Sequence, residues 1–257
     1  MFQLEEFDIK LDTKFIGRNF IYADSLSSTN SFLLNSEKKY SNGTVLLAEY
    51  QENGRGRLRR PWQSTKEQNL TFSILLNKKL EKYVPNHINL AASLAVSQSI
   101  EHLYQLKTDL KWPNDVLIKN KKVSGILLES KSKGSNLEKI VVGIGINVNQ
   151  TKFDGEFSIQ PTSIKYEMRQ IINREILLSE ILNTFEELLE LSKQNSKKLL
   201  DTWRENCRML GEDVKIAHNG EIKYGNFYDI DANGFMILNV DNKMEKITTG
   251  DVTVIKK

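Results

Sequence analysis

The sequence predicts an α+β fold in which a main domain of mixed strands and helices precedes a small all-β domain. Strand-like runs recur in the first half of the chain, and apolar residues recur at helical spacing over about 88–106 and 175–193. Beyond Gly211 only short β segments follow, separated by Asn-Gly pairs that favour tight turns. We therefore expect a main domain over residues 1–209 and a β domain over residues 210–257.

The order of the elements follows from propensity and turn signals. Residues 1–27 show no clear pattern, and the polar residues at 27–30 predict the start of a short helix. A final helix of the main domain is expected over about 197–206. The expected strands cover about 44–50, 69–76, 110–112, 115–118, 123–129 and 140–148. The expected hairpin turns are Asn120-Lys121, Asn219-Gly220 and Asn233-Gly234.

Composition and charge narrow the class of protein. The chain is 39% hydrophobic, which is typical of a folded globular protein and too apolar for a disordered one. With 36 Lys and Arg against 33 Asp and Glu, the net charge of +3 is smaller than that of proteins that coat DNA. The sequence shows no run of about 18 apolar residues and no signal peptide. We therefore expect a cytoplasmic protein without a membrane span.

The cysteine and the histidines offer little chemistry. A single cysteine, Cys207, excludes an intramolecular disulfide and a multi-cysteine zinc site, and it suits a reducing compartment. We expect Cys207 to be an inert packing residue. The three histidines, His87, His102 and His218, are isolated in the sequence, and we expect surface or packing roles for them.

Residues Gly54–Trp62, called here the arginine–glycine loop, are the most informative segment. Two glycines let the backbone approach a ligand, and four arginines offer forked donors that match phosphate or carboxylate. Because Leu58 is its one aliphatic residue, the loop has little apolar surface to bury, and we expect a ligand to order it. The alternative is a solvated basic loop or a nucleic-acid arm, although one short loop makes few phosphate contacts.

Two segments place polar residues beside predicted strands. In Lys111–Asp115 a proline lies between two β stretches, where it aims Asn114 and Asp115 or simply forms a capped turn. Lys122 lies at a hairpin tip, and lysines at such tips are usually solvated. A functional role for Lys122 requires that it point into a pocket beside the arginine–glycine loop.

A glycine-rich strand supplies the last segment, Gly143–Asn147. It is not a dinucleotide fingerprint, because Val148 stands where the third glycine is required and no helix follows directly. Glycines within an apolar strand indicate close approach of another backbone or of a flat ring. The sequence also lacks a phosphate-binding P-loop, a serine nucleophile elbow and a His-Glu-x-x-His motif. The remaining chemistry is anion binding by Arg and Lys, which suits stabilisation of a phosphoryl-transfer transition state.

Together these segments resemble the biotin protein ligases, over a range from about residue 20 to the C-terminus. Their order and their spacing both agree with the family. The resemblance implies a central mixed sheet flanked by helices, of the class II aminoacyl-tRNA synthetase-like kind, followed by an SH3-like β-barrel. The segments that carry the resemblance are Ser28-Thr29-Asn30, Gln51, Gly54-Arg55-Gly56-Arg57 with Trp62, Lys111-Trp112-Pro113-Asn114-Asp115, Lys122 to Leu127, and Gly143 to Asn147.

The resemblance implies a two-step reaction. The carboxylate of biotin attacks the α-phosphate of ATP, which releases pyrophosphate and leaves biotinyl-5′-adenylate. A lysine of a biotin carboxyl carrier protein then attacks this mixed anhydride. Mg²⁺ is expected to accompany the triphosphate, with Asp115 as a candidate ligand.

The same resemblance implies roles for individual residues. Lys122, Arg55 and Arg57 are the expected catalytic residues, and Lys122 is expected to act in both steps. The expected biotin site comprises Ser28, Thr29, Asn30, Gln51, Gly54, Arg55, Gly56, Arg57, Lys122 and Gly125. The expected ATP site comprises Arg57, Arg60, Trp62, Lys111, Asn114 and Asn147.

Two departures from the family pattern affect these expectations. Arg59 stands where family loops often have a third glycine, which bears on the shape of the loop. The motif at Ser28 begins too early for a helix-turn-helix domain to precede it, so we expect a monofunctional ligase without specific DNA binding. A lipoate–protein ligase and a basic-loop nucleic-acid-binding module stay open as alternatives. The sequence also leaves a homodimer open.

Overall fold

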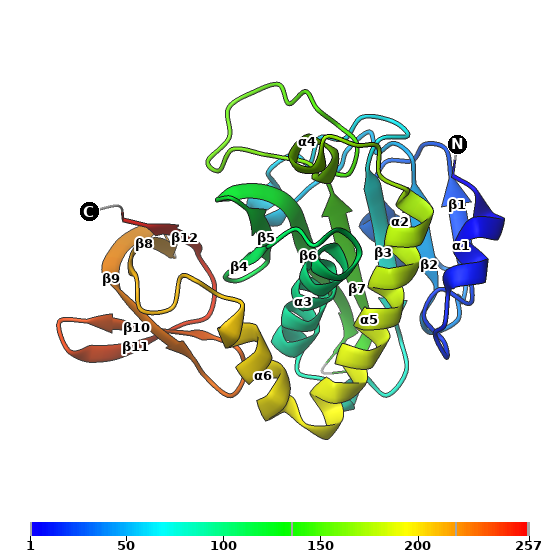
Figure 1. Ribbon diagram of the computed structural model, residues 1–257. Coiled ribbons are helices and arrows are strands. Elements are labelled where there is room, and N and C mark those ends of the chain that lie inside the picture. Colours follow the sequence, from blue (N-terminus) through cyan, green and yellow to red (C-terminus); the bar gives the residue numbers. More distant parts are fainter. Residues whose placement is uncertain (1, 135, 219, 256–257) are drawn as a thin grey trace.

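The computed structural model describes residues 2–134, 136–218 and 220–255 and contains two β-sheets (Figure 1). The larger sheet has seven strands in the order β1-β2-β3-β7-β6-β5-β4, and the smaller has five in the order β11-β10-β9-β8-β12. In the larger sheet β1 and β2 run parallel, while the other neighbours are antiparallel. The main sheet is therefore mixed, which confirms the predicted fold class.

The element bounds are as follows. The larger sheet is built from β1 (Phe20–Ala23), β2 (Val45–Ala48), β3 (Leu70–Leu76), β4 (Asp109–Lys111), β5 (Asp115–Ile118), β6 (Lys121–Lys133) and β7 (Asn136–Ile146). The helices are α1 (Leu4–Lys10), α2 (Thr29–Asn35), α3 (Pro85–Tyr104), α4 (Ile164–Met168), α5 (Arg174–Gln194) and α6 (Ser196–Glu205), with short 3₁₀ turns at Arg57–Arg59 and Leu80–Lys82. None of the described helices is long and apolar enough to cross a membrane.

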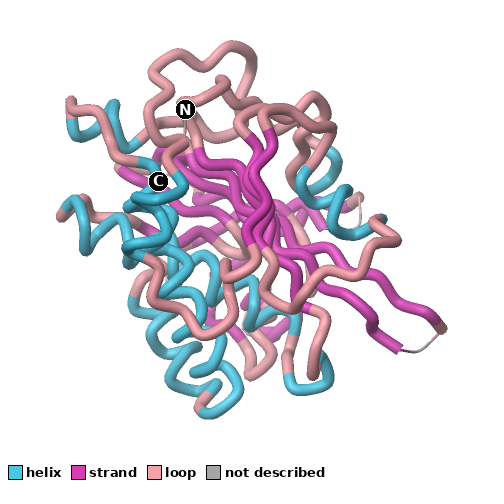
Figure 2. Tube along the Cα trace, turned by 90° about the vertical axis from the view of Figure 1, so that its right-hand side faces the viewer, coloured by secondary structure: helices cyan, strands magenta, loops and turns pink. Residues whose placement is uncertain are grey.

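Helices cover both faces of the larger sheet. Successive strand residues point to opposite faces, so alternate positions join different apolar layers. Leu46 and Leu75 pack with Leu33 of α2, whereas Val45 and Ile74 belong to the core beneath α3 and α5. Figure 2 shows this arrangement, with most of the helices on one side of the strands. The long helical patterns predicted from the sequence are therefore the core-facing helices α3 and α5.

The hairpins differ from the expected pattern in two places. The turn between β5 and β6 was expected at Asn120-Lys121, and this register is wrong by one residue. Lys119 and Asn120 are the turn residues, because they have φ of 50° and 63°, as the central pair of a tight hairpin turn requires. Strands β6 and β7 also continue beyond the apolar segments through residues 130–133 and 136–139, which are mostly exposed and whose polar sequence carries no strand signal.

The smaller sheet comprises β8 (Asp213–His218), β9 (Glu221–Ile230), β10 (Met236–Val240), β11 (Lys243–Ile247) and β12 (Asp251–Val254). The expected Asn233-Gly234 turn is confirmed, with Gly234 at φ 78°, whereas the Asn219-Gly220 turn includes residue 219, which lies outside the described residues. The sheet is fastened to the main domain through Arg204 of α6, whose guanidinium lies 2.7 Å from both Asp229 Oδ1 and the Ile230 carbonyl oxygen. The domain boundary near residue 210 stays a prediction.

Candidate active site

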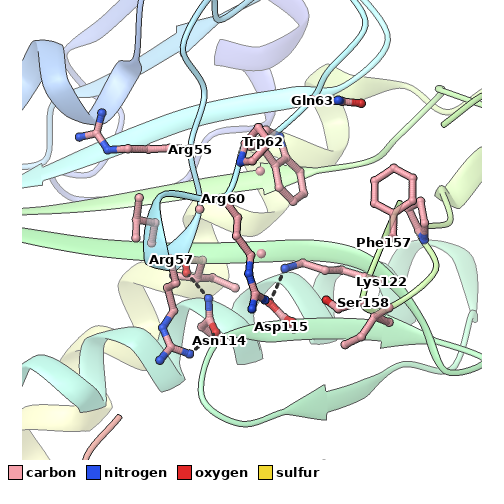
Figure 3. A pocket seen from close by; sticks show the side chains of 18 of the residues that line it. Arg55, Arg57, Arg60, Trp62, Gln63, Asn114, Asp115, Lys122, Phe157 and Ser158 are labelled. Atoms are coloured by element: carbon pink, nitrogen blue, oxygen red, sulfur yellow. Dashed lines mark hydrogen bonds and ion pairs between the residues drawn. The ribbon is translucent and has the colours of Figure 1, made fainter. Parts of the chain in front are cut away.

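A cavity of about 740 Å³ lies between the larger sheet, the arginine–glycine loop and the smaller sheet (Figure 3). The segment that follows β7 also lines it, from Phe153 to Ile159 and at Pro161. All of the site residues expected from the sequence line this cavity except Gly54. A Cβ at Gly54 would lie 2.7 Å from the backbone oxygen of Trp62, so Gly54 instead allows two strands of the loop to approach each other.

One end of the cavity is lined by buried polar residues. Ser28 caps α2, and its Oγ accepts a hydrogen bond from the backbone N–H of Ser31. The Oε1 of Gln51 accepts hydrogen bonds from the backbone N–H and the Oγ1 of Thr29, at 2.7 and 3.0 Å. The hydroxyl of Ser73 lies 2.7 Å from Thr29 Oγ1 and 2.6 Å from Asn30 Oδ1. These contacts fix the polar groups before any ligand enters.

The orientation of Asn30 depends on two neighbours from other strands. Its Nδ2 donates to Glu129 Oε2 at 2.8 Å and to the Leu127 carbonyl oxygen at 3.1 Å. The facing position on β7 is Gly143, where a Cβ would lie 2.8 Å from Asn30 Cγ. A side chain at this position would therefore displace the amide of Asn30.

The glycines of β6 and β7 form a flat floor that an indole ring covers. Gly125 and Gly145 are register partners, and a Cβ at Gly145 would lie 2.6 Å from Cζ2 of Trp62. The sequence predicted close approach of another backbone or a flat ring to Gly143 and Gly145; the ring of Trp62 lies against Gly145, whereas the side-chain amide of Asn30 lies against Gly143. Within the described part of the chain, the buried Nε1 of Trp62 has no hydrogen-bond partner.

The loop arginines have different partners. Arg55 forms an ion pair with Glu129, in which Nη2 lies 3.0 and 3.1 Å from the two carboxylate oxygens, and Arg60 forms an ion pair with Asp251 of the smaller sheet. Arg57 donates to Asn114 Oδ1 at 3.1 Å and to the Gly250 carbonyl oxygen at 3.2 Å. Arg57 therefore reaches the cavity held by two neutral acceptors, with its charge available to an anion.

The loop has a left-handed backbone conformation at two consecutive residues that are not glycine. Arg59 has φ of 57°, in the left-handed region that favours glycine, and the preceding Leu58 has φ of 54°. The side chain of Leu58 is 69% exposed, so the loop gains little from apolar burial, as its composition predicted. Polar contacts hold the loop in place instead.

Lysines complete the anion-binding end. Lys122 points into the cavity, with Nζ 2.6 Å from Asp115 Oδ1 and 5.8 Å from the centre of the Trp62 ring (Figure 3). The geometry required for a functional Lys122 is thus present. Burial lowers the pKa of Lys111, although the Asp115 carboxylate opposes this shift, and burial also lowers the pKa of Arg57. A bound anion would offset the cost of burying these charges.

Two asparagines expected to contact ATP have structural partners as well. Asn114 accepts from Arg57 and donates through Nδ2 to the Ile126 carbonyl oxygen at 2.6 Å, so it holds the guanidinium in position. Asn147 donates through Nδ2 to the Thr162 carbonyl oxygen at 3.0 Å and so ties β7 to the segment beside the cavity. Both side chains line the cavity and brace its walls.

Residues outside the cavity agree with the predicted packing roles. Cys207 is buried, and burial raises the pKa of its thiol to about 12, so the reactive thiolate is disfavoured. His87 is buried and contacts the Ala232 carbonyl oxygen at 2.9 Å, whereas His102 pairs with Glu180 at the surface. Among the described residues, no group of three or more His, Cys, Asp or Glu could hold a metal ion.

Several residues at the site carried no sequence signal. Glu129 and Ser73 lie within apolar strands and read as ordinary alternating positions. Asp251 and Lys215 line the cavity from the smaller sheet, and no motif in the sequence indicates that this sheet reaches the cavity.

Comparison with protein families agrees with this geometry. The model of the Biotin/lipoate A/B protein ligase family matches residues 22–147, and that of the Biotin protein ligase C terminal domain matches residues 209–254. The bifunctional ligase/repressor BirA of Bacillus subtilis is 30% identical over 256 residues, which cover 97% of this chain and 79% of that protein. The biotin–[acetyl-CoA-carboxylase] ligase of Mycobacterium tuberculosis is 29% identical over 221 residues, which cover 83% of this chain and 80% of that protein.

A solved structure of a biotin protein ligase has a similar fold. The biotin protein ligase of Aquifex aeolicus, in complex with biotin and ATP, superimposes with a TM-score of 0.82 and 31% sequence identity. The superposition covers 93% of this chain and 100% of that one. The fold agrees with that of the solved ligase, and the sequence matches cover almost the whole chain. This chain therefore belongs to the biotin protein ligase family.

Proposed function

We propose that this ligase uses the cavity to activate biotin with ATP and then to transfer biotin to a lysine of a carrier domain of a carboxylase. The observation that carries this assignment is the polarity of the cavity. Its one end presents the neutral polar groups of Thr29, Asn30 and Gln51, and its other end presents Arg57, Lys111 and Lys122. A ligand with a polar neutral ring system and a carboxylate beside a triphosphate matches both ends.

In the first step a carboxylate oxygen of biotin attacks the α-phosphorus of ATP, and the bond from that phosphorus to the bridging oxygen of pyrophosphate breaks. Negative charge develops on the α-phosphoryl oxygens and on the leaving pyrophosphate. Lys122 and Arg57 are placed to stabilise this charge, and Lys111 adds a buried cation. We propose that Trp62 and Asn147 border the adenine, where the unpaired Nε1–H of Trp62 can find an acceptor.

In the second step the amine of a carrier lysine attacks the acyl carbon of the mixed anhydride. An amide bond forms, the bond to the phosphate oxygen breaks, AMP leaves, and the amine proton is lost to solvent. We propose that Lys122 binds the same phosphate and stabilises the departing AMP. The arginine–glycine loop shields the anhydride from water between the two steps.

Magnesium fits this site as a companion of the substrate. Mg²⁺ is usually held by one or two carboxylates together with substrate phosphates and water. Asp115 lines the cavity and offers one carboxylate, which Lys122 shares in the structure. We propose that Mg²⁺ binds chiefly to phosphate oxygens, near Asp115, and supplies neutralisation of the triphosphate charge.

The partners of the arginines bear on the nucleic-acid alternative. Arg55 and Arg60 turn toward Glu129 and Asp251 of the same chain, which leaves fewer free cations for phosphates of a long polyanion. Pyrophosphate release is the deciding measurement, made with ATP plus biotin, with ATP plus lipoate and with ATP alone. We expect release with biotin, followed by biotinylation of an added carrier domain. Release that requires lipoate, or no release with either acid, would contradict the proposal.

A further inference from the structure

Glu129 contacts both the polar end of the cavity, at Asn30, and the arginine–glycine loop, at Arg55. It lies on β6, its side chain is 26% exposed, and its two oxygens accept from different elements. Oε2 accepts from Asn30 Nδ2 at 2.8 Å, and both oxygens accept from Arg55 Nη2, at 3.0 and 3.1 Å. One carboxylate therefore holds a residue of the polar end of the cavity and an arginine of the arginine–glycine loop.

These contacts complete a continuous hydrogen-bonded chain. It begins at Gln51, which accepts from Thr29, and passes through Ser73 to Asn30. From Asn30 it continues through Glu129 to Arg55. Arg55 also donates to the Ser31 hydroxyl at 2.7 Å, so the series of hydrogen bonds ends on α2, the helix that also carries Thr29 and Asn30. The chain links the polar end of the cavity to the loop above it.

The charge of Glu129 has two consequences. A carboxylate can only accept, so it requires that the donor group of Asn30 face it and leaves Asn30 Oδ1 directed at Ser73. It also neutralises Arg55, so this arginine acts as an anchor for the loop and leaves the substrate anions to Arg57 and the lysines. Hydrogen bonds between two charged groups, such as this one, are stronger than neutral hydrogen bonds.

We propose that Glu129 is a positioning residue that couples closure of the arginine–glycine loop to the orientation of Asn30. The placement of biotin beside Asn30 rests on the proposed function, whereas the anchoring of the loop through Arg55 rests on the structure alone. The coupling means that a correctly oriented Asn30 and a closed loop stabilise each other. Binding of biotin at the polar end then favours a closed loop.

The test compares Glu129→Gln, Arg55→Met and the double variant with the unmodified enzyme. The glutamine keeps the size of Glu129 and removes its charge. Tryptic cleavage after Arg57 and Arg59 measures opening of the loop without any substrate, whereas the bond between Arg60 and Pro61 resists trypsin. We expect each single variant to raise the cleavage rate about 10-fold, the scale of one lost charged hydrogen bond, and the double variant to be no faster than either.

Kinetics supply the second readout. In Glu129→Gln we expect the KM for biotin to rise about 10-fold, while kcat at saturating biotin changes less than about 3-fold. Glu138→Gln, an exposed carboxylate on the neighbouring strand β7, is the matched control and should change neither quantity. Thermal unfolding of all variants separates local opening from general loss of stability.

The cleavage assay and the kinetic assay distinguish failure of the proposed function from failure of the coupling through Glu129. If the unmodified enzyme releases no pyrophosphate with biotin, the proposed function fails, and the cleavage assay still tests the anchor. If Glu129→Gln leaves loop cleavage unchanged, or if the two single effects add in the double variant, the coupling through Glu129 is wrong. A fall of about 10-fold in the kcat of Glu129→Gln, with an unchanged KM for biotin, would also contradict the coupling.

Discussion

The indole of Trp62 lies directly against the backbone of Gly145, in a space that any other side chain at position 145 would fill. Gly143, two residues earlier on the same face of β7, leaves the corresponding space for Asn30. Two glycines of one strand therefore serve two ends of the cavity. Gly143 leaves room for Asn30 and Gly145 leaves room for Trp62, so substitutions at the two glycines should disturb different parts of the cavity.

Gly143→Ala and Gly145→Ala are predicted to have different kinetic effects. A methyl group at position 143 would displace Asn30, and one at position 145 would displace Trp62; overpacking of this kind costs about 1–3 kcal/mol. We expect Gly143→Ala to raise the KM for biotin roughly 10-fold and Gly145→Ala to raise the KM for ATP roughly 10-fold. Steady-state kinetics with each substrate varied in turn makes the comparison. Equal effects on the same substrate would contradict it.

Lys122→Ala is predicted to slow formation of the adenylate about 10²-fold or more, which is the usual scale for one charge aimed at a transition state. Binding of biotin and ATP should weaken much less than the rate falls. Single-turnover release of pyrophosphate measures the step. Lys121→Ala is the control, because the Nζ of Lys121 lies over the ring of Tyr166, 5.5 Å from its centre. Similar rates for the two variants would remove Lys122 from the mechanism.

Arg57→Lys is predicted to lose activity although it keeps the positive charge. The guanidinium bonds Asn114 with one nitrogen and the Gly250 carbonyl oxygen with another, and a lysine cannot reproduce this fork. We expect kcat/KM for ATP to fall about 10-fold or more, the scale of lost charged hydrogen bonds. Retention of full activity would mean that charge alone matters at this position.

Arg59→Gly is predicted to have little effect on activity and to stabilise the fold slightly. Glycine relieves about 1–2 kcal/mol of backbone strain at the positive φ of this residue, but it also gives the unfolded chain about 0.4–1 kcal/mol more conformational freedom. The difference leaves a net gain of about 0–1.6 kcal/mol, so Tm should rise by no more than a few degrees and biotin-dependent pyrophosphate release should stay close to its original value. A large loss of activity would show that the Arg59 side chain, and not the loop backbone, contributes to the site.

The sequence predicted the local features of this enzyme better than its long-range contacts. The helical stripes of α3 and α5 are periodic, and the apolar runs of β2, β3 and β7 are rich in residues that favour strands; the structure confirms both. The segment 1–27 gave no pattern, although it forms α1 and β1, because short elements repeat too few times to show a period. Its buried residue Phe7 packs on Phe20, a contact that no local pattern reveals.

The site shows the same division. Arg57 could be chosen from its motif, since an arginine beside a glycine fits an anionic ligand, and Lys122 could be chosen from the family resemblance. Glu129, Gly250 and Asp251 could not, because their roles depend on which strands the fold brings to the cavity. Even the direction of Arg55, toward a carboxylate of its own chain, follows from the tertiary structure.

The buried ion pair of Glu49 and Arg174 is predicted to contribute to the stability of the fold. The Glu49 side chain is 0% exposed and that of Arg174 6%, with contacts of 2.5 and 3.0 Å, and Tyr22 donates to Glu49 at 2.9 Å. Arg174→Met leaves the carboxylate buried without its partner and should cost about 3–5 kcal/mol. The double variant Glu49→Leu/Arg174→Met removes both charges, and we expect it to recover most of that loss.

The pH dependence of this pair has a definite sign. Burial acts to raise the pKa of Glu49, but the hydrogen bonds and charge of Arg174 outweigh it, so the pKa lies below the usual value of 4.5. A lowered pKa stabilises the fold above the pKa of the unfolded chain, and this contribution is lost as pH falls through the folded pKa. In Arg174→Met the unpaired carboxylate instead binds a proton readily. Urea unfolding from pH 7 down to pH 4 should therefore show the difference between the two proteins shrinking, and a constant difference would mean that the pair contributes by packing alone.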